Sequence, residues 1–245
     1  MNYTIVENPK YGGWAGYILR PPGNNSDEVF EGIKTSFNVP YTYHTNLSTN
    51  QGIAIWIGIG GYLTVNLIQV GIEADNLTAE PSNIHYSAYK SWYDLFPFQV
   101  NTVPFIPSIG ENLTVSIRLV NATNNIWQIF LMNSNNGLVY YNSTVNFRVP
   151  LNTAEAIVEV PNLSEYSPPA FSPIEFRNIS TYLCTRTNCK TCPLDNMSHI
   201  SVGINIFNST NPSQKIVIEP SKIFNNSFSV YYNGTLPENS VSGSK

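Results

Sequence analysis

The sequence predicts an all-β fold, and three observations support this prediction. Apolar and polar residues alternate in short runs, which is the side-chain period of a β-strand. Helical periodicity is almost absent. Turn-forming residues separate the runs, with 15 glycines and 17 prolines in 245 residues. A chain of this length can bury a substantial core, so we expect one domain over residues 1–236 and a polar, disordered tail over residues 237–245.

The runs place the expected strands in order along the chain. The first half should contain an opening strand pair within residues 3–19, strands within 29–39, 55–61, 67–73 and 86–97, and a surface loop at 102–109. The second half should contain a meander at 112–120, 127–132, 138–142 and 144–149, a strand at 153–161, and strands at 174–176, 200–207, 216–218 and 228–232. We see no repeat and no domain boundary in this series.

The strand at residues 153–161 has two different faces. Alternation places small apolar residues on one face and Glu155, Ile157 and Glu159 on the other, and Pro161 ends the strand. The apolar face belongs in a core. On alternation alone, the carboxylate face is more often a solvated sheet surface than one wall of a site.

Three other predicted strands repeat this arrangement. One face carries isoleucine or valine, and the other carries tryptophan, glycine and carboxyl or amide groups. The polar faces hold Trp56, then Gln69 and Glu73, then Trp92 and Asp94. Aromatic rings, glycines that admit a ligand backbone and a few hydrogen-bonding groups are what a peptide or sugar groove requires.

Short motifs recur in one order along these strands. They are Trp56-Ile57-Gly58-Ile59, Leu67-Ile68-Gln69-Val70-Gly71, Ser91-Trp92-Tyr93-Asp94-Leu95-Phe96-Pro97, Ala154-Glu155-Ala156-Ile157-Val158-Glu159 and Ala170-Phe171-Ser172-Pro173-Ile174-Glu175-Phe176, after an opening Gly13-Trp14-Ala15-Gly16. In order and rough spacing the chain resembles the glutamic peptidases (eqolisins). The resemblance implies an antiparallel β-sandwich of two large sheets, with a concanavalin A-like, lectin-like jelly-roll architecture. It also implies a catalytic pair at Gln69 and Glu159.

The implied pair has the parts that peptide hydrolysis needs. A carboxylate such as Glu159 can take a proton from water and later return it to the leaving nitrogen, and the amide of Gln69 can stabilise the oxyanion. The residues expected to line or support the site are Trp14, Trp56, Glu73, Trp92 and Asp94, although a tryptophan in a β-sandwich is often simply core. An ionised Glu159 with a pKa of about 4.3 predicts an optimum at roughly pH 2–5.

The resemblance has two visible departures. Gly60 stands where the family usually has an aspartate, and Gly13 stands in place of the opening asparagine. The alternative function is a non-catalytic β-sandwich that binds carbohydrate or protein. Serine and two-aspartate mechanisms lack their motifs, because the chain has no Gly-X-Ser-X-Gly, Asp-Thr-Gly or Asp-Ser-Gly sequence.

Composition restricts the partners. Only 11% of residues are charged and the net charge is -4, which argues against nucleic acid as a partner. With 12 Lys and Arg residues, the chain gains little self-repulsion as its carboxylates are protonated, which favours acid tolerance. The uncharged stretch 52–72 reads as two strands and a turn rather than a membrane span. We expect a monomer that acts on polypeptide substrates without a cofactor or metal.

Many Asn-X-Ser/Thr sequons favour a glycosylated, extracellular (secreted) protein. They begin at Asn2, Asn24, Asn46, Asn76, Asn112, Asn121, Asn142, Asn162, Asn178, Asn196, Asn208, Asn225 and Asn233. No signal peptide precedes them, so we expect a mature form with an added methionine.

Three cysteines lie close together near the C-terminal end. Cys184, Cys189 and Cys192 could form a Cys3His zinc site with His199. In an oxidising compartment a disulfide between two of them is favoured, which leaves one thiol over.

Overall fold

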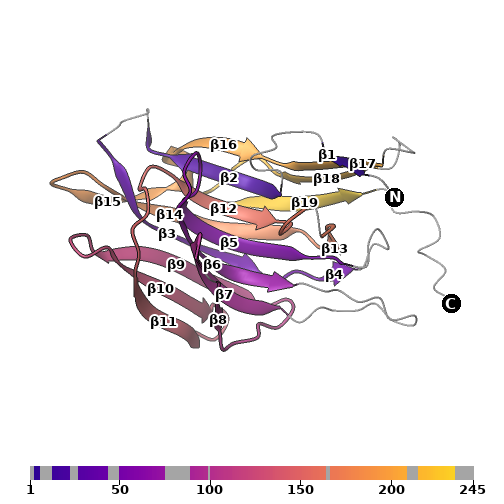
Figure 1. The fold of residues 1–245 in the computed structure, drawn as a ribbon, viewed down its shortest axis with the longest axis horizontal. Helices are drawn as coiled ribbons and strands as arrows, with labels where there is room; N and C mark the ends of the chain where they lie inside the picture. Colours follow the sequence, from indigo (N-terminus) through magenta and orange to yellow (C-terminus); the bar gives the residue numbers. More distant parts are fainter. Residues whose placement is uncertain are drawn as a thin grey trace.

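The computed structural model describes residues 3–5, 13–22, 27–43, 50–74, 89–98, 100–163, 166–208 and 215–234. The chain forms a β-sandwich of two large antiparallel sheets, as the resemblance implied (Figure 1). Within the described ranges the regular elements are strands and short 3-10 turns such as η2 (Leu194–Asn196). None of the described residues forms a helix long and apolar enough to cross a membrane. The expected tail at 237–245 lies outside the described residues.

The larger sheet has ten strands. In spatial order they are β1 (Tyr3–Ile5), β17 (Ile204–Asn208), β18 (Lys215–Pro220), β19 (Phe228–Gly234), β14 (Ile174–Cys184), β3 (Val29–Asn38), β9 (Asn112–Asn121), β10 (Ile126–Asn133) and β11 (Val139–Asn146), with β15 (Cys189–Pro193) paired to β14.

The second sheet has seven strands. In spatial order they are β16 (Ser198–Val202), β2 (Trp14–Arg20), β12 (Ala154–Glu159), β5 (Ile53–Gly60), β6 (Leu67–Ala74), β7 (Lys90–Phe96) and β8 (Asn101–Val103). A small separate ladder joins β4 (Thr42–Tyr43) to β13 (Ala170–Phe171). Strand β12 is therefore near the middle of its sheet, between β2 and β5.

The core lies between the two sheets and consists of their inward faces. The isoleucine and valine faces of β5 and β6 and the alanine and valine face of β12 are fully buried there, against Phe and Ile side chains of β3 and β9. Burying one such isoleucine or valine side chain contributes about 1.5–3 kcal/mol to folding. Because side chains alternate, this packing turns the tryptophan and carboxyl faces of β5, β6, β7 and β12 away from the core.

Several strands differ from the sequence-based expectation. β1 pairs with β17 and not with β2, so the predicted opening strand pair is wrong. The expected strand at 200–207 is divided at Gly203 into β16 and β17, which belong to different sheets. The two expected strands within residues 138–149 are one strand, β11, and β8 occupies part of the expected loop at 102–109. These differences concern long-range pairing, which a local alternation pattern does not encode.

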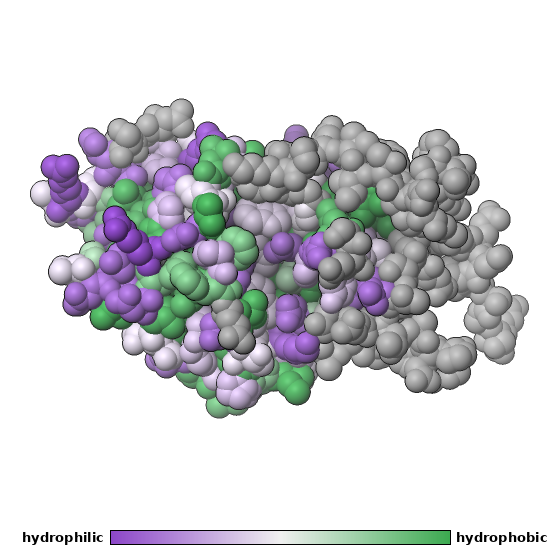
Figure 2. Space-filling model, viewed as in Figure 1, coloured by the Kyte–Doolittle hydropathy of each residue, from purple (hydrophilic) through white to green (hydrophobic). Residues whose placement is uncertain are grey.

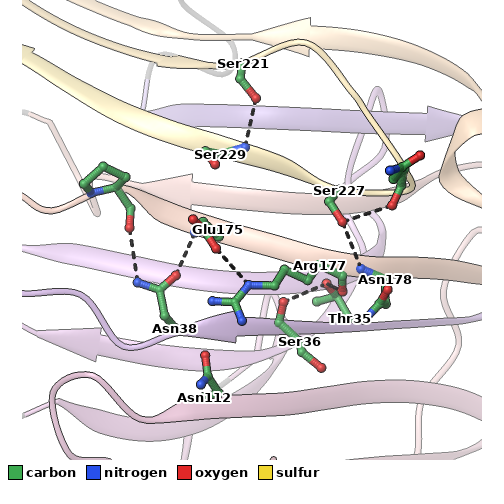
Figure 3. Close-up of polar contacts among 12 residues, drawn as sticks. Thr35, Ser36, Asn38, Asn112, Glu175, Arg177, Asn178, Ser221, Ser227 and Ser229 are labelled. Atoms are coloured by element: carbon green, nitrogen blue, oxygen red, sulfur yellow. Dashed lines mark hydrogen bonds and ion pairs between the residues drawn. The ribbon is translucent and has the colours of Figure 1, made fainter.

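Polar side chains tie neighbouring strands together on the outer face of the ten-stranded sheet (Figure 3). Asn38 on β3 donates to the carbonyl of Pro173 over 3.1 Å and accepts the backbone N–H of Glu175 over 2.8 Å. The guanidinium Nε of Arg177 forms an ion pair with Glu175 at 2.9 Å. These contacts fasten β3 to the start of β14.

The cysteines form one disulfide, as predicted. Cys184 and Cys189 are joined across the β14–β15 hairpin, and Cys192 is a buried free thiol. Two of the three candidate ligands are therefore oxidised, which excludes the Cys3His zinc site. Hydrophilic residues gather at this end of the molecule (Figure 2), where residues 185–191 are exposed.

The described sequon asparagines lie mainly on the surface. Exposed side chains belong to Asn121, Asn142, Asn162, Asn178, Asn196, Asn225 and Asn233. Asn112 is half-buried. Asn2, Asn24, Asn46 and Asn76, and the side chain of Asn208, lie outside the described residues.

Candidate active site

Strand pairing aligns the predicted site residues on the outer face of the seven-stranded sheet. Three transverse rows run across β12, β5, β6 and β7. The first row is Glu155, Gly58, Gln69 and Asp94; the second is Ile157, Trp56, Gly71 and Trp92; the third is Glu159, Ala54, Glu73 and Lys90. Trp14 on β2 is level with Glu159. All seven site residues named from the sequence therefore share one face, and for all of them except Trp14 alternation predicted that face.

The side chains on this face are much less exposed to solvent than the sequence predicts. Gln69 is 8% exposed, Asp94 is 4% exposed and Glu155 has no exposed surface, whereas Glu159 is partly exposed. The sequence-based expectation that Glu155 lies on an open sheet surface is wrong. A local alternation pattern shows which side chains share a face, but it does not show what covers that face.

Glu159 is held by indole groups. Trp56 Nε1 donates to Glu159 Oε2 over 2.8 Å. Burial raises the pKa of Glu159 to about 7, more than the hydrogen bonds from Trp56 and Trp14 lower it, and the negative charges of Asp94 and Glu73 raise it further. The carboxyl of Glu159 is therefore protonated in acid solution and exchanges its proton near neutral pH.

Gln69 is oriented by Asp94 on the neighbouring strand. Gln69 Nε2 donates to Asp94 Oδ2 over 3.0 Å, and the two residues are direct cross-strand partners. Burial raises the pKa of Asp94, and the hydrogen bond from Gln69 lowers it by less. A side-chain amide held in this way keeps its second N–H for another acceptor.

Tryptophan rings form the apolar part of the face. Trp14 and Trp56 meet edge to face with ring centroids 5.0 Å apart. Trp56, Trp92, Leu67 and other buried side chains form a small cluster on this side of the sheet, separate from the main core. These rings position the Glu159 carboxyl and also keep water from it, which is the physical cause of its raised pKa.

Gly71 lies between Trp56 and Trp92 in the middle row. A Cβ at Gly71 would lie 2.1 Å from the carbonyl oxygen of Ile55 and 2.7 Å from Trp56 Cβ. No side chain fits there, so the space above the backbone of Gly71, between the two indoles, contains no side chain from this position.

Several buried polar atoms on this face lack a hydrogen-bond partner among the described residues. They are Gln69 Oε1, Asp94 Oδ1, Trp92 Nε1 and both carboxylate oxygens of Glu155. Unsatisfied buried polar atoms are rare in folded proteins, and each costs about 1–3 kcal/mol. Their concentration around one row of the sheet marks a place that a polar ligand or water can occupy.

Glu159 and Gln69 share the face without touching. They lie two strands apart, with β5 between them, and four residues apart along the strand direction, because Glu159 is level with Glu73 rather than with Gln69. The described residues include no hydrogen bond between them. A substrate carbonyl and a water would have to connect the two groups.

Comparison with known proteins identifies the family and the fold. The Peptidase A4 family matches residues 12–230. The crystal structure of scytalido-glutamic peptidase with a peptide-based transition state analog is similar, with 19% identity over 94% of this chain and 100% of that chain and a TM-score of 0.62. SCP-B, a member of the eqolisin family in a complex with the tripeptide Ala-Ile-His, has 18% identity over 94% and 100% of the two chains and a TM-score of 0.61.

Curated proteins give no match to the chain. At their level of identity the solved structures establish the β-sandwich fold, and the family match over most of the chain establishes the family. It also decides for a peptidase over the non-catalytic binding alternative. The chain therefore belongs to the Peptidase A4 family, the glutamic peptidases or eqolisins, and it is a peptidase.

Proposed function

We propose that this peptidase is a secreted, acid-acting endopeptidase in which Glu159 transfers protons and Gln69 stabilises the oxyanion. The observation that carries the proposal is the Glu159 carboxyl, which is hydrogen-bonded to Trp56 and lies on the same sheet face as Gln69. The partnerless polar atoms beside Gln69 supply the second half of the argument, because a bound peptide group can satisfy them. The exposed sequon asparagines support secretion, and the monomeric state stays an expectation.

The raised pKa of Glu159 changes the expected chemistry. The sequence predicts an ionised carboxylate with an ordinary pKa, but a group with a pKa of about 7 carries its proton throughout the acid range. Glu159 therefore enters the reaction as a carboxylic acid. We expect activity where Glu159 is protonated and a decline as pH rises through about 7.

A neutral carboxyl can give one proton and take another. In the proposed reaction, water attacks the scissile carbonyl carbon and a C–O bond forms. Gln69 donates its free N–H to the carbonyl oxygen as negative charge develops there. The Glu159 O–H gives its proton to the leaving nitrogen as the C–N bond breaks, and the carboxyl receives the proton that the water loses. The enzyme ends in its starting protonation state.

The test is hydrolysis of an unfolded protein, such as reduced and alkylated casein, across about pH 2–8. Gln69→Ala and Glu159→Gln should each lower kcat/KM by about a hundredfold or more, because an oxyanion donor or a proton-transfer group is lost. Glu219→Gln is the matched control, since Glu219 is an exposed carboxyl on β18 of the other sheet. It should leave the rate unchanged. Wild-type rates in a folded Glu159→Gln variant would refute the assignment.

A further inference from the structure

The outer face of the ten-stranded sheet carries a groove on the side of the sandwich opposite the candidate active site. It has a volume of about 420 Å³, within the range of about 300–1,000 Å³ that small-ligand sites occupy. Two transverse rows line it. The first is Tyr182, Gly32, Arg118 and Gln128, and the second is Ser180, Lys34, Ser116, Phe130 and Asn142.

Gly32 keeps the floor of the groove low. A Cβ at this position would lie 2.9 Å from the carbonyl oxygen of Ile117 and 3.3 Å from Tyr182 Cβ, so a larger residue would crowd both neighbouring strands. Across this gap, the Arg118 guanidinium lies 4.6 Å from the centroid of the Tyr182 ring. The ring orients a cation above the groove without neutralising its charge.

The groove is cationic in a chain of net charge -4. Lys34 and Arg118 are both exposed, and no carboxylate is among the lining residues. The described part of the chain provides no ion pair for either cation. Arg177, on the next row of the same face, contrasts with them because it is paired with Glu175 (Figure 3). A negatively charged ligand is the complement that Lys34 and Arg118 lack.

The remaining lining groups favour a hydroxyl-rich ligand over a peptide. Gln128 Nε2 donates to Asn142 Oδ1 over 2.8 Å, which leaves the Gln128 oxygen and the Asn142 N–H₂ group for a ligand. Phe130 is half-buried and offers an apolar surface beside these amides. The central strands β3, β9 and β10 are paired on both sides, so their backbones cannot add a peptide strand.

We infer that this groove binds an acidic oligosaccharide, with Lys34 and Arg118 on its carboxylate groups and Gln128 and Asn142 on its hydroxyls. The inference is independent of the proposed catalytic residues, since the groove and the candidate active site lie on opposite faces of the sandwich. Such a site would hold the peptidase on acidic polysaccharide while the other face remains open to substrate.

The experiment measures binding of trigalacturonic acid by calorimetry at about pH 5, where uronic carboxyls are ionised. Asn142 begins a sequon inside the groove, and the inference requires that this asparagine carries no glycan, so the protein comes from a host without N-glycosylation. Parallel titrations use the neutral trisaccharide maltotriose and the peptide triglutamate. Lys34→Gln and Arg118→Gln are the test variants. Lys222→Gln is the matched control, since Lys222 is an exposed cation between β18 and β19.

Trigalacturonic acid should bind and maltotriose should not. Each test variant should weaken binding about tenfold, the usual loss for one charge-assisted hydrogen bond, while the control binds as the unsubstituted protein does. Casein hydrolysis should be unchanged in Lys34→Gln. Equal binding of maltotriose, tighter binding of triglutamate, or an unaltered affinity in both test variants would overturn the inference.

Discussion

Replacing Glu155 with glutamine tests the most unusual burial in the molecule. Glu155 has no exposed surface, and neither of its carboxylate oxygens has a hydrogen-bond partner among the described residues. Burial raises its pKa well above the ordinary value, more than the nearby Thr153 hydroxyl lowers it. The folded protein therefore keeps this proton at a pH where the unfolded chain has lost it.

The sign and size of the effect follow from proton linkage. A raised carboxyl pKa gives stability that is present below the unfolded pKa of about 4.5 and is lost as pH rises toward the folded pKa. In that window, each proton that the folded protein keeps and the unfolded chain loses lowers the free energy of unfolding by about 1.4 kcal/mol per pH unit. Between the unfolded pKa and the folded pKa, Glu155 alone therefore lowers the free energy of unfolding by this amount for each unit of pH. This is a large share of the roughly 5–15 kcal/mol that holds a domain folded.

Urea denaturation, followed by tryptophan fluorescence at pH 4, 5, 6 and 7, measures the effect. Glutamine has the shape of a protonated glutamate and cannot ionise, so Glu155→Gln should match the wild type at about pH 4. Above that pH its advantage in the free energy of unfolding should grow by about 1.4 kcal/mol for each pH unit over which the folded wild type keeps the Glu155 proton. The exposed Glu219→Gln control should follow the wild type at every pH. A difference between Glu155→Gln and wild type that is the same at pH 4 and pH 7 would refute the reasoning.

Three further predictions concern Glu159, the surface and the free thiol. The negative charge of Asp94 raises the pKa of Glu159, so the decline of kcat/KM at high pH should move to lower pH in Asp94→Asn. The Trp56 N–H lowers the pKa of Glu159, so the same decline should move to higher pH in Trp56→Phe. Equal shifts of both variants in one direction would contradict this. Material from a glycosylating, secreting host should lose mass on deglycosylation, and a mass equal to the bare chain would remove the case for glycosylation. Iodoacetamide should label the buried Cys192 only after unfolding, and rapid labelling of folded protein would contradict its burial.

Alternation in the sequence was sufficient to place the site residues on one face. Trp56, Gln69 and Glu159 each lie on the outer face of a strand whose inner face carries isoleucine, valine or alanine. Burial of those inner faces is strongly favoured, and a shift of the pairing register by one residue would expose them. The three faces could therefore be assigned before any strand was paired. The resemblance supplied the identity of the pair, which alternation does not give.

The order of strands was not predictable in the same way. β12 lies between β2 and β5, which are separated from it by about a hundred residues or more of sequence. β16 and β17 follow each other directly but join different sheets at Gly203. Such pairings depend on how whole faces meet, and short apolar runs carry no information on their partners.

The state of the carboxyl groups was the largest error of the sequence reading. Alternation predicts that a glutamate at an outward position meets water, which implies an ordinary pKa for Glu159. In the folded protein the carboxyls of Glu155, Glu159 and Asp94 are desolvated, and all three have raised pKa values. The change comes from desolvation, which depends on the tertiary surroundings of each group rather than on its neighbours in sequence.

The same burial links acid stability to the proposed acid chemistry. A face that keeps Glu155 and Glu159 protonated is most stable at low pH, and that is also where Glu159 has a proton to donate. The two residues should nevertheless separate the effects, because Glu155 makes no hydrogen bond to the indoles that hold Glu159. Glu155→Gln should be more stable than the wild type at neutral pH and still has the proton donor Glu159. Glu159→Gln lacks the proton donor. In the proposed mechanism, acid activity therefore depends on Glu159, whereas both residues lower the stability of the fold at neutral pH.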